Sequence, residues 1–408
     1  MFLSLTGNNN VVPGQTVTVA ARMAIVALLL LTGCTSTVRH DHSAVSKMPQ
    51  HAVDKHAPDP VHKTPVLDLG AAPDLEGIIP RLADKRVVLV GERHNRFDHH
   101  LAQLEIIRRL HALHPRLAIG MEAFQQPFQG VLDDYIAGNL SERELLRATE
   151  YYQRWKFDFR HYAPILRYAR EHQLPVVALN LPAELTRKVG RNGRDVLTAE
   201  EQAQLPAEID RSDADYEKRL RGIFNQHPHN STRHFDNFLE VQLLWDEGMA
   251  EQAADFLKAH PDYTMVILAG SGHVARGSGI PRRLTRRLQA DIAIVLNGWD
   301  GTLAPDLADF VLLTEPRKLP PAGTFGVLLD DAAAVPTVST CLSDSPCKSA
   351  GLQRGDRFLS IDGEPINDMP DLRLVMWDKQ PGDTVNLEIS RTRWFSQPQE
   401  LSYTIELQ

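Results

Sequence analysis

The alternation of short apolar runs with amphipathic segments constrains the fold of this 408-residue chain more than any other feature. Apolar runs of this length predict strands that are buried on both faces. Leucine and isoleucine residues follow the first run with helical spacing. Strands that alternate with helices predict an α/β fold with a mostly parallel sheet and flanking helices over residues 66–317. The predicted strands are 86–92, 117–122, 175–180, 264–270, 291–297 and 309–314.

Residues 181–260 form a long stretch without a predicted strand, and we expect a helical subdomain or lid there. Large residues recur on one face of a helix at positions 238, 245, 249 and 256. Gln242 lies inside this apolar stripe, and Asp246 follows one helical turn later. A buried glutamine needs hydrogen-bond partners. Gln242 could find them by facing a ligand-binding cleft or by bonding to a neighbouring loop.

The composition narrows the class of protein. Lys plus Arg is 44 and Asp plus Glu is 52, a formal charge of −8, and no long basic run is present. This balance argues against nucleic-acid binding. Hydrophobic residues make up 43% and charged residues 24%, which is typical of globular domains.

Polar side chains follow the predicted strands where those strands end. Glu92 and His94 follow the first strand, Glu122 and Asn180 end the next two, and His273 follows the fourth. Ligands of open parallel sheets bind outside the carboxyl ends of the strands. We therefore expect these groups to meet at one edge of the sheet.

This set of residues is compatible with several chemistries. His94, His273 and Glu122 could hold a divalent transition metal, with Glu92 activating a water molecule. If the protein is an enzyme, Glu92 and Glu122 are the candidate catalytic residues. Proton transfer without a metal would use the same histidine and glutamate side chains. Imidazole also ligates haem iron. Hydrogen bonding at strand ends with no ligand is the structural alternative.

The motifs resemble those of the ChaN family, in the haem-binding uptake and Tiki superfamily. Gly91-Glu-Arg-His94 looks like the opening motif of that family, and Gly120-Met-Glu-Ala-Phe124 follows in order. The later motifs include Gly270-Ser-Gly-His273, and the likeness covers roughly residues 75–315. The remaining motifs are Asp98-His-His-Leu-Ala-Gln103, Asn180-Leu-Pro182 and Gln242-Leu-Leu-Trp-Asp246.

The resemblance assigns the site more closely than it assigns the reaction. ChaN-like proteins are haem-binding lipoproteins, which implies haem as the ligand. Tiki relatives are metal-dependent peptidases that use two Gly-x-x-His motifs and a Glu, and both Gly-x-x-His motifs stand here. Erythromycin esterases are more distant relatives that use a similar Glu-x-His element. The ligand cleft implied by the motifs comprises Glu92, His94, His100, Gln103, Glu122, Asn180, Gln242, Asp246 and His273.

The N-terminal segment is typical of an export signal. Arg22 precedes an apolar run over residues 24–31, which is too short to span a bilayer. Leu31-Thr32-Gly33-Cys34 resembles a bacterial lipobox, which implies a signal peptide over residues 1–33 and a lipid such as palmitate on Cys34. The residues before position 22 are uncharged, so translation could start further downstream. The absence of Asp after the cysteine favours the outer membrane, facing the periplasm.

Two histidine-rich segments accompany these features. Residues 34–65 lack hydrophobic periodicity and predict a flexible tether, whose five histidines are either solvated or able to scavenge metal ions. His227, His229 and His234 lie in a predicted loop. This loop is either solvated or a source of an axial haem ligand, which it could also supply to the other subunit of a homodimer.

Residues 322–408 resemble a bacterial PDZ domain, a β-rich module that follows a proline-rich linker. Phe325, Gly326 and Val327 look like its carboxylate-binding loop, and residues 371–377 like its groove helix. This resemblance implies recognition of a peptide or protein partner through strand addition, or a groove filled by the chain's own segment. Cys341 and Cys347 both lie in this module, and they are either two thiols or a disulfide formed after export.

Together these features predict a membrane-anchored lipoprotein that binds haem in iron acquisition, with a PDZ module that recruits a partner. The alternative is a metal-dependent peptidase or hydrolase that uses the same His and Glu cluster.

Overall fold

The fold is described here from a computed structural model that covers residues 67–68, 70–226, 234–298, 301, 303–392 and 397–408. These residues belong to one compact unit. The predicted signal peptide, Cys34, the tether, His227 and His229 lie outside the described residues.

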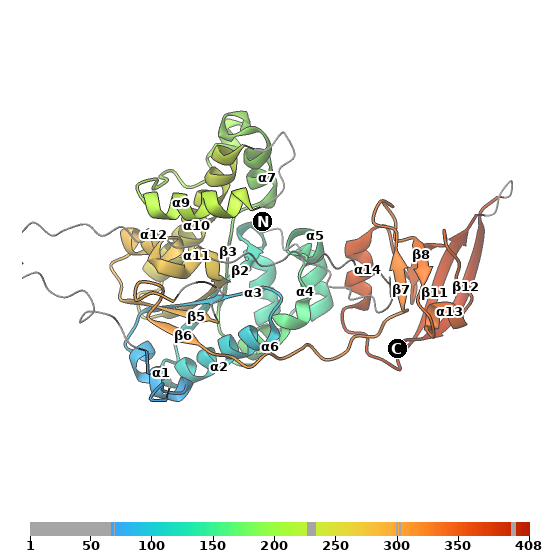
Figure 1. Ribbon diagram of the computed structural model, residues 1–408, viewed down its shortest axis with the longest axis horizontal. Helices are drawn as coiled ribbons and strands as arrows, with labels where there is room; N and C mark the ends of the chain where they lie inside the picture. Colours follow the sequence, from blue (N-terminus) through green and yellow to red (C-terminus); the bar gives the residue numbers. More distant parts are fainter. Residues whose placement is uncertain (1–66, 69, 227–233, 299–300, 302, 393–396) are drawn as a thin grey trace, which may run out of the picture. The chain divides into compact units, whose positions relative to one another are not determined.

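Six parallel strands form the central sheet, in the order β3-β2-β4-β1-β5-β6 (Figure 1). The predicted α/β class is confirmed, and each predicted strand is present. Burial of the strand residues explains the continuous apolar runs, because helices cover both faces. The strands are β1 (Val87–Glu92), β2 (Leu117–Gln125), β3 (Val176–Asn180), β4 (Thr264–Gly270), β5 (Ile292–Asn297) and β6 (Phe310–Leu312).

The two faces of the sheet bury alternate residues of each strand. Val88 and Val90 pack into the cluster that includes Ile106 of α2, whereas Val87 and Leu89 pack into the cluster that includes Met249 of α10. The helices before α7 are α1 (Leu75–Ala83), α2 (Phe97–Leu113), α3 (Gln129–Ile136), α4 (Glu142–Ala148), α5 (Tyr151–Arg154) and α6 (Ala163–Glu171). A short 3-10 helix, Phe159–His161, precedes α6.

The predicted helical subdomain lies between β3 and β4. Its long helix, α10, spans Phe235–Ala259, and Met249 lies in the core. The other helices are α7 (Ala183–Asn192), α8 (Ala199–Gln202) and α9 (Ala214–Asn225), and α11 (Ser271–Val274) and α12 (Ile280–Arg287) follow β4. No helix among the described residues is long and apolar enough to cross a membrane.

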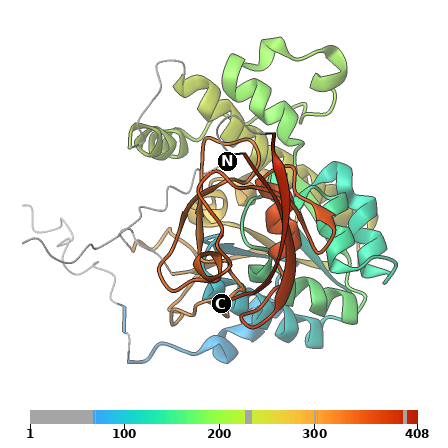
Figure 2. The same ribbon diagram turned by 90° about the vertical axis from the view of Figure 1, so that its right-hand side faces the viewer.

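The C-terminal module is β-rich with its own core, which includes Phe325, Phe358, Leu387 and Ile405. Strands β11 (Thr384–Arg391) and β12 (Gln399–Glu406) pair along their length (Figure 2). The antiparallel order is β10-β9-β11-β12, with β7 and β8 paired separately. The other elements are β7 (Val327–Leu329), β8 (Val338–Cys341), α13 (Pro346–Ser349), β9 (Arg357–Ile361), β10 (Glu364–Pro365) and α14 (Met369–Met376).

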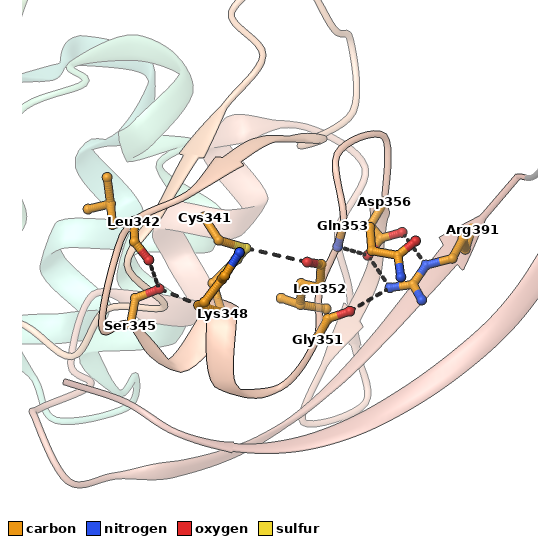
Figure 3. Close-up of a disulfide and its surroundings, with 10 residues drawn as sticks. Cys341, Leu342, Ser345, Lys348, Gly351, Leu352, Gln353, Asp356 and Arg391 are labelled. Atoms are coloured by element: carbon orange, nitrogen blue, oxygen red, sulfur yellow. Dashed lines mark hydrogen bonds and ion pairs between the residues drawn. A yellow bond between two sulfur atoms is a disulfide. The ribbon is translucent and has the colours of Figure 1, made fainter.

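Two internal links hold the PDZ-like module together (Figure 3). Cys341 and Cys347 form a disulfide across a Cα distance of 5.5 Å, which resolves the two alternatives left open by the sequence. Asp356 is fully buried and accepts two bonds from Arg391, Nε to Oδ1 at 2.7 Å and Nη2 to Oδ2 at 2.6 Å. This buried, bidentate ion pair fixes the segment around Asp356 to β11.

Candidate functional site

The site lies where the two central strands of the sheet end. Glu92 is the last residue of β1, and its register partner on β4 is Gly270. His94 follows β1 by two residues, and His273 stands on α11 directly after β4. Because β1 and β4 are parallel neighbours, their carboxyl ends bring both histidines to the same edge.

The first histidine of the site is paired with a buried carboxylate. Nδ1 of His94 lies 2.6 Å from Oε1 of Glu92, and the side chains are 12% and 3% exposed. The hydroxyl of Tyr162 donates to the same carboxylate oxygen at 3.3 Å. Nε2 of His100 lies 3.3 Å from the other oxygen, Oε2. His94 and Tyr162 therefore orient Glu92 through Oε1, whereas His100 contacts Oε2 only at ion-pair distance.

The second histidine has an equivalent partner on α10. Nδ1 of His273 lies 2.7 Å from Oδ1 of Asp246, and both side chains are almost fully buried. The hydroxyl of Tyr216 donates to Oδ2 of Asp246 at 2.7 Å. A carboxylate that holds Nδ1 fixes the orientation of the imidazole ring.

Glu122 lies between the two pairs. Its Oε2 accepts a bond from the backbone N–H of Gly270 at 2.7 Å, and its Oε1 lies 3.6 Å from Nε2 of His273. A Cβ added at Gly270 would lie 3.2 Å from Nε2 of His94 and 3.6 Å from Oε2 of Glu122. The missing side chain of Gly270 therefore leaves a small space beside both groups.

These contacts set the charge of the site. Burial by itself would raise the pKa of Glu92, but the neighbouring imidazoles of His94 and His100 outweigh it and lower that pKa to about 2. Burial likewise opposes the charge of His94, yet Glu92 and Glu122 raise its pKa to about 9. Against burial, Glu122 and Asp246 raise the pKa of His273. Both imidazoles are thus stabilised as cations beside carboxylates.

An aromatic group flanks the more exposed histidine. The ring centre of His94 lies 4.7 Å from that of Trp155 and 4.8 Å from that of Phe157. Trp155 and Phe157 are both partly exposed. The site therefore has a polar interior at Glu122 and an apolar wall toward its outer side.

Other residues of the predicted cleft support the site. Asn180 donates to the backbone oxygen of Glu122 at 3.1 Å. Gln103 lies 3.0 Å from Nδ1 of His100 and donates to the backbone of Val90 at 3.1 Å, so it positions His100. Gln242 is 2% exposed, and its Oε1 has no hydrogen-bond partner within the described part of the chain. A buried oxygen of this kind suits a ligand or water that donates to it.

The boundary predicted for the second strand was wrong. Strand β2 continues from Glu122 to Gln125, and its register to β3 shifts between Met121 and Gln125. Glu122 lies within this irregular stretch of β2, and its carboxylate accepts the backbone N–H of Gly270.

Tyr162, Tyr216, Trp155 and Phe157 were not predicted as site residues from the sequence. These side chains come from helices, turns and bends, where no strand end signals their position. Within the residues that the structure describes, no group of three or more His, Cys, Asp or Glu residues is arranged to hold a metal ion. The metal set His94, His273 and Glu122 therefore stays a prediction.

Comparison with known families decides the identity of the α/β domain. Residues 78–284, about half of the chain, match the family described as haem-binding uptake, Tiki superfamily, ChaN. The chain belongs to this ChaN family. Residues 323–402 match the PDZ domain family. Both matches fall inside the domain limits expected from the sequence.

Individual relatives of the ChaN-type domain are distant. A solved structure described as "Cofacial heme binding to ChaN of Campylobacter jejuni" is 20% identical, covers 60% of this chain and 92% of its own, and has a TM-score of 0.49. A curated relative, RETICULATA-RELATED 5 of Arabidopsis thaliana chloroplasts, is 23% identical over 55% of this chain. The match spans about a third (32%) of that relative's length.

The PDZ domain also has solved neighbours. The PDZ domain of a carboxy-terminal protease from Vibrio cholerae, in complex with a peptide, is 18% identical, with a TM-score of 0.18. It covers 21% of this chain and 93% of its own. In the present chain, the carbonyl of Phe325 accepts from Cys347 N–H at 2.8 Å and that of Gly326 from Leu342 N–H at 2.9 Å. The disulfide-linked segments thus hold the predicted carboxylate-binding loop.

The ChaN-type site can bind a small polar ligand and transfer protons. Each imidazole has one nitrogen fixed by a carboxylate, while Glu122 offers a third titratable group between them. A histidine cation is a general acid, and its neutral form is a general base.

Proposed function

We propose that the ChaN-type domain binds haem and that the PDZ domain recognises a peptide or protein partner. The observation that carries the haem proposal is the family match over residues 78–284. Haem supplies an iron atom that accepts one or two axial ligands and a porphyrin that prefers apolar contacts.

The residues at the outer side of the site fit haem. His94 would be the ligand residue after its Nε2 gives up a proton, because Glu92 holds its Nδ1 and Nε2 lies beside the space kept open by Gly270. Trp155 and Phe157 offer partly exposed rings for contact with an apolar ligand. His273 is 1% exposed and would act inside the site rather than on the porphyrin.

A hemin titration tests this proposal. The wild-type chain should give a saturable, shifted Soret band, and His94→Ala should weaken binding at least tenfold. His260→Asn, a change at an exposed histidine stacked on Phe256, is the matched control and should leave the titration unchanged. An unshifted Soret band with the wild-type protein would reject haem binding.

For the PDZ domain, we propose capture of an extended C-terminal peptide along β7. Phe325, Gly326 and Val327 supply the backbone at the start of this strand. Fluorescence polarisation with a library of free-acid peptides should find binders, and the same peptides with an amidated C-terminus should bind much more weakly. Equal binding of both forms would contradict the proposed carboxylate loop.

We also propose that the chain is an exported lipoprotein that serves iron acquisition at the outer membrane. The lipobox-like Leu31-Thr-Gly-Cys34 supports it, and a disulfide is typical of oxidising compartments. Cys34→Ala should abolish incorporation of a labelled fatty acid and move the protein out of the membrane fraction. Growth on haem as the iron source should then depend on Cys34. Unchanged membrane retention in the variant would contradict anchoring at this residue.

A second function, hydrolysis, is favoured by the convergence of two carboxylate-held imidazoles on Glu122. Such pairs are used for proton transfer and also orient metal-binding histidines. Peptidase or esterase activity should be assayed with and without added Zn²⁺. Glu92→Gln should abolish turnover while sparing ligand binding. Activity that survives Glu92→Gln would contradict a hydrolytic role for this site.

A further inference from the structure

A second group of histidines lies on the surface of the ChaN-type domain, where α2 and α6 run beside each other (Figure 1). His111 belongs to the last turn of α2, and His172 directly follows α6. Eleven residues of helix separate His111 from His100 of the site described above, which corresponds to about 16 Å along α2. This group is therefore distinct from the Glu92–His94 pair.

The two rings have the spacing of imidazoles that share one metal ion. Their centres lie 5.2 Å apart, with an angle of 63° between the ring planes. With metal-to-nitrogen distances of about 2.1 Å and a tetrahedral angle, two imidazole centres on one ion lie about 5 Å apart. His172 is exposed and His111 half-buried, so an ion from solvent can reach the pair.

Tyr168 holds both rings in place. Its hydroxyl lies 2.9 Å from Nδ1 of His111, and its ring centre is 4.2 Å from that of His172. The hydrogen bond to Nδ1 fixes the ring of His111 and leaves Nε2 as the ligating nitrogen.

We propose that His111 and His172 form a two-histidine site for a divalent transition metal, with Tyr168 as the positioning residue. Zn²⁺, Cu²⁺ and Ni²⁺ all accept imidazole ligands. Two protein ligands leave the remaining coordination positions to water, so the ion is exchangeable. The site is compatible with the absence of larger His, Cys, Asp and Glu groups among the described residues.

Anomalous diffraction from crystals of the full chain soaked in Zn²⁺ tests the site directly. We expect a zinc peak about 2.0–2.1 Å from one nitrogen of each ring. The absence of a peak at this position in the wild-type protein overturns the proposal. Because the readout is local, zinc held by other histidines of the chain does not affect it.

Calorimetric titration with Zn²⁺ supplies the measurement in solution. His111→Gln and His172→Asn should each remove the same zinc equivalent, and Tyr168→Phe should weaken it by about tenfold or more. His260→Asn is the control, because this exposed histidine stacks on Phe256 and Tyr263 instead of on another histidine. If His111→Gln and His172→Asn retain the zinc equivalents and affinities of the wild type, the rings merely pack together.

Discussion

Oε1 of Glu122 lies 3.6 Å from Nε2 of His273, while the other oxygen of the same carboxylate accepts the backbone N–H of Gly270. Glu122 is thus fixed by the main chain on one side and faces an imidazole on the other. His94 lies across the space beside Gly270. The site is therefore a connected series of polar groups, in which the pKa of Glu92 is lowered and those of His94 and His273 are raised.

Removal of Glu92 should lower the pKa of His94. This carboxylate is a main cause of the rise of that pKa to about 9, so Glu92→Gln should shift it downward by at least one unit. Titration of the imidazole resonances by NMR gives the measurement. Asp246→Asn is the matched control, since it removes the partner of His273 and should move that resonance more than the one of His94. A His94 titration unaffected by Glu92→Gln would contradict the assigned pair.

The same pair predicts how stability depends on pH. The folded-state pKa of His94 is raised to about 9 from 6.5, so its contribution is complete below pH 6.5 and is lost as pH rises through 9. The pKa of Glu92 is lowered from 4.5 to about 2, so its contribution is complete above pH 4.5 and is lost toward pH 2. The pair therefore stabilises most between pH 4.5 and 6.5.

Urea unfolding of wild type and Glu92→Gln measures this window. Within it, loss of one partner of a buried pair should cost roughly 3 kcal/mol. The difference between the two proteins should shrink as pH approaches 9. A constant difference from pH 5 to 9 would show that the pair is not charged as described.

Gly270→Ala should fill the space at the centre of the site. The backbone of Gly270 has φ −56° and ψ 139°, which alanine adopts without strain, so the effect comes from crowding alone. The new Cβ would lie 3.1 Å from Cε1 and 3.2 Å from Nε2 of His94. Overpacking of this kind costs about 1–3 kcal/mol.

We expect ligand binding by Gly270→Ala to fall at least tenfold while the circular dichroism spectrum stays native. Gly222→Ala on α9 is the control, because its Cβ would meet nothing within 4 Å. That change should leave binding intact and raise the unfolding free energy slightly, by up to about 1 kcal/mol. Equal binding by Gly270→Ala and wild type would show that this space does not receive the ligand.

The sequence predicted the sheet and its polar edge because strands of a parallel sheet that is buried on both faces are continuous apolar runs, and polar residues follow them. Glu92, His94 and His273 could be placed at one edge of the sheet, because each ends or follows a predicted parallel strand. Tyr162 and Tyr216 could not, because each reaches its carboxylate from a helical segment far along the chain. Their positions depend on how helices pack, and hydrophobic periodicity carries no information about such a contact. Glu122 was misplaced at a strand end because a register shift leaves no pattern in one sequence.

Loss of the disulfide should destabilise the PDZ domain modestly. Cys341 and Cys347 are six residues apart, and closing so short a loop stabilises by about 2 kcal/mol in the chain-entropy description. The variant Cys341→Ala/Cys347→Ala should show this loss in denaturant unfolding, and a dithiol reductant should produce a similar loss in the wild type. Reductant should not affect the double variant. If reduction leaves the wild-type unfolding curve unchanged, the disulfide does not form in solution.

Gly326→Ala should disrupt the predicted carboxylate-binding loop. Gly326 has φ +61°, and a Cβ there would lie 2.4 Å from Cβ of Ser345, a buried residue with little room to move. Gly363 has a similar φ of +80°, but a Cβ there would meet nothing within 4 Å. Both alanine variants carry the left-handed backbone penalty of about 1–2 kcal/mol, so their difference isolates the clash at the loop. Polarisation assays should show that Gly326→Ala loses peptide binding more than tenfold while Gly363→Ala retains it, and equal affinities would place the peptide elsewhere.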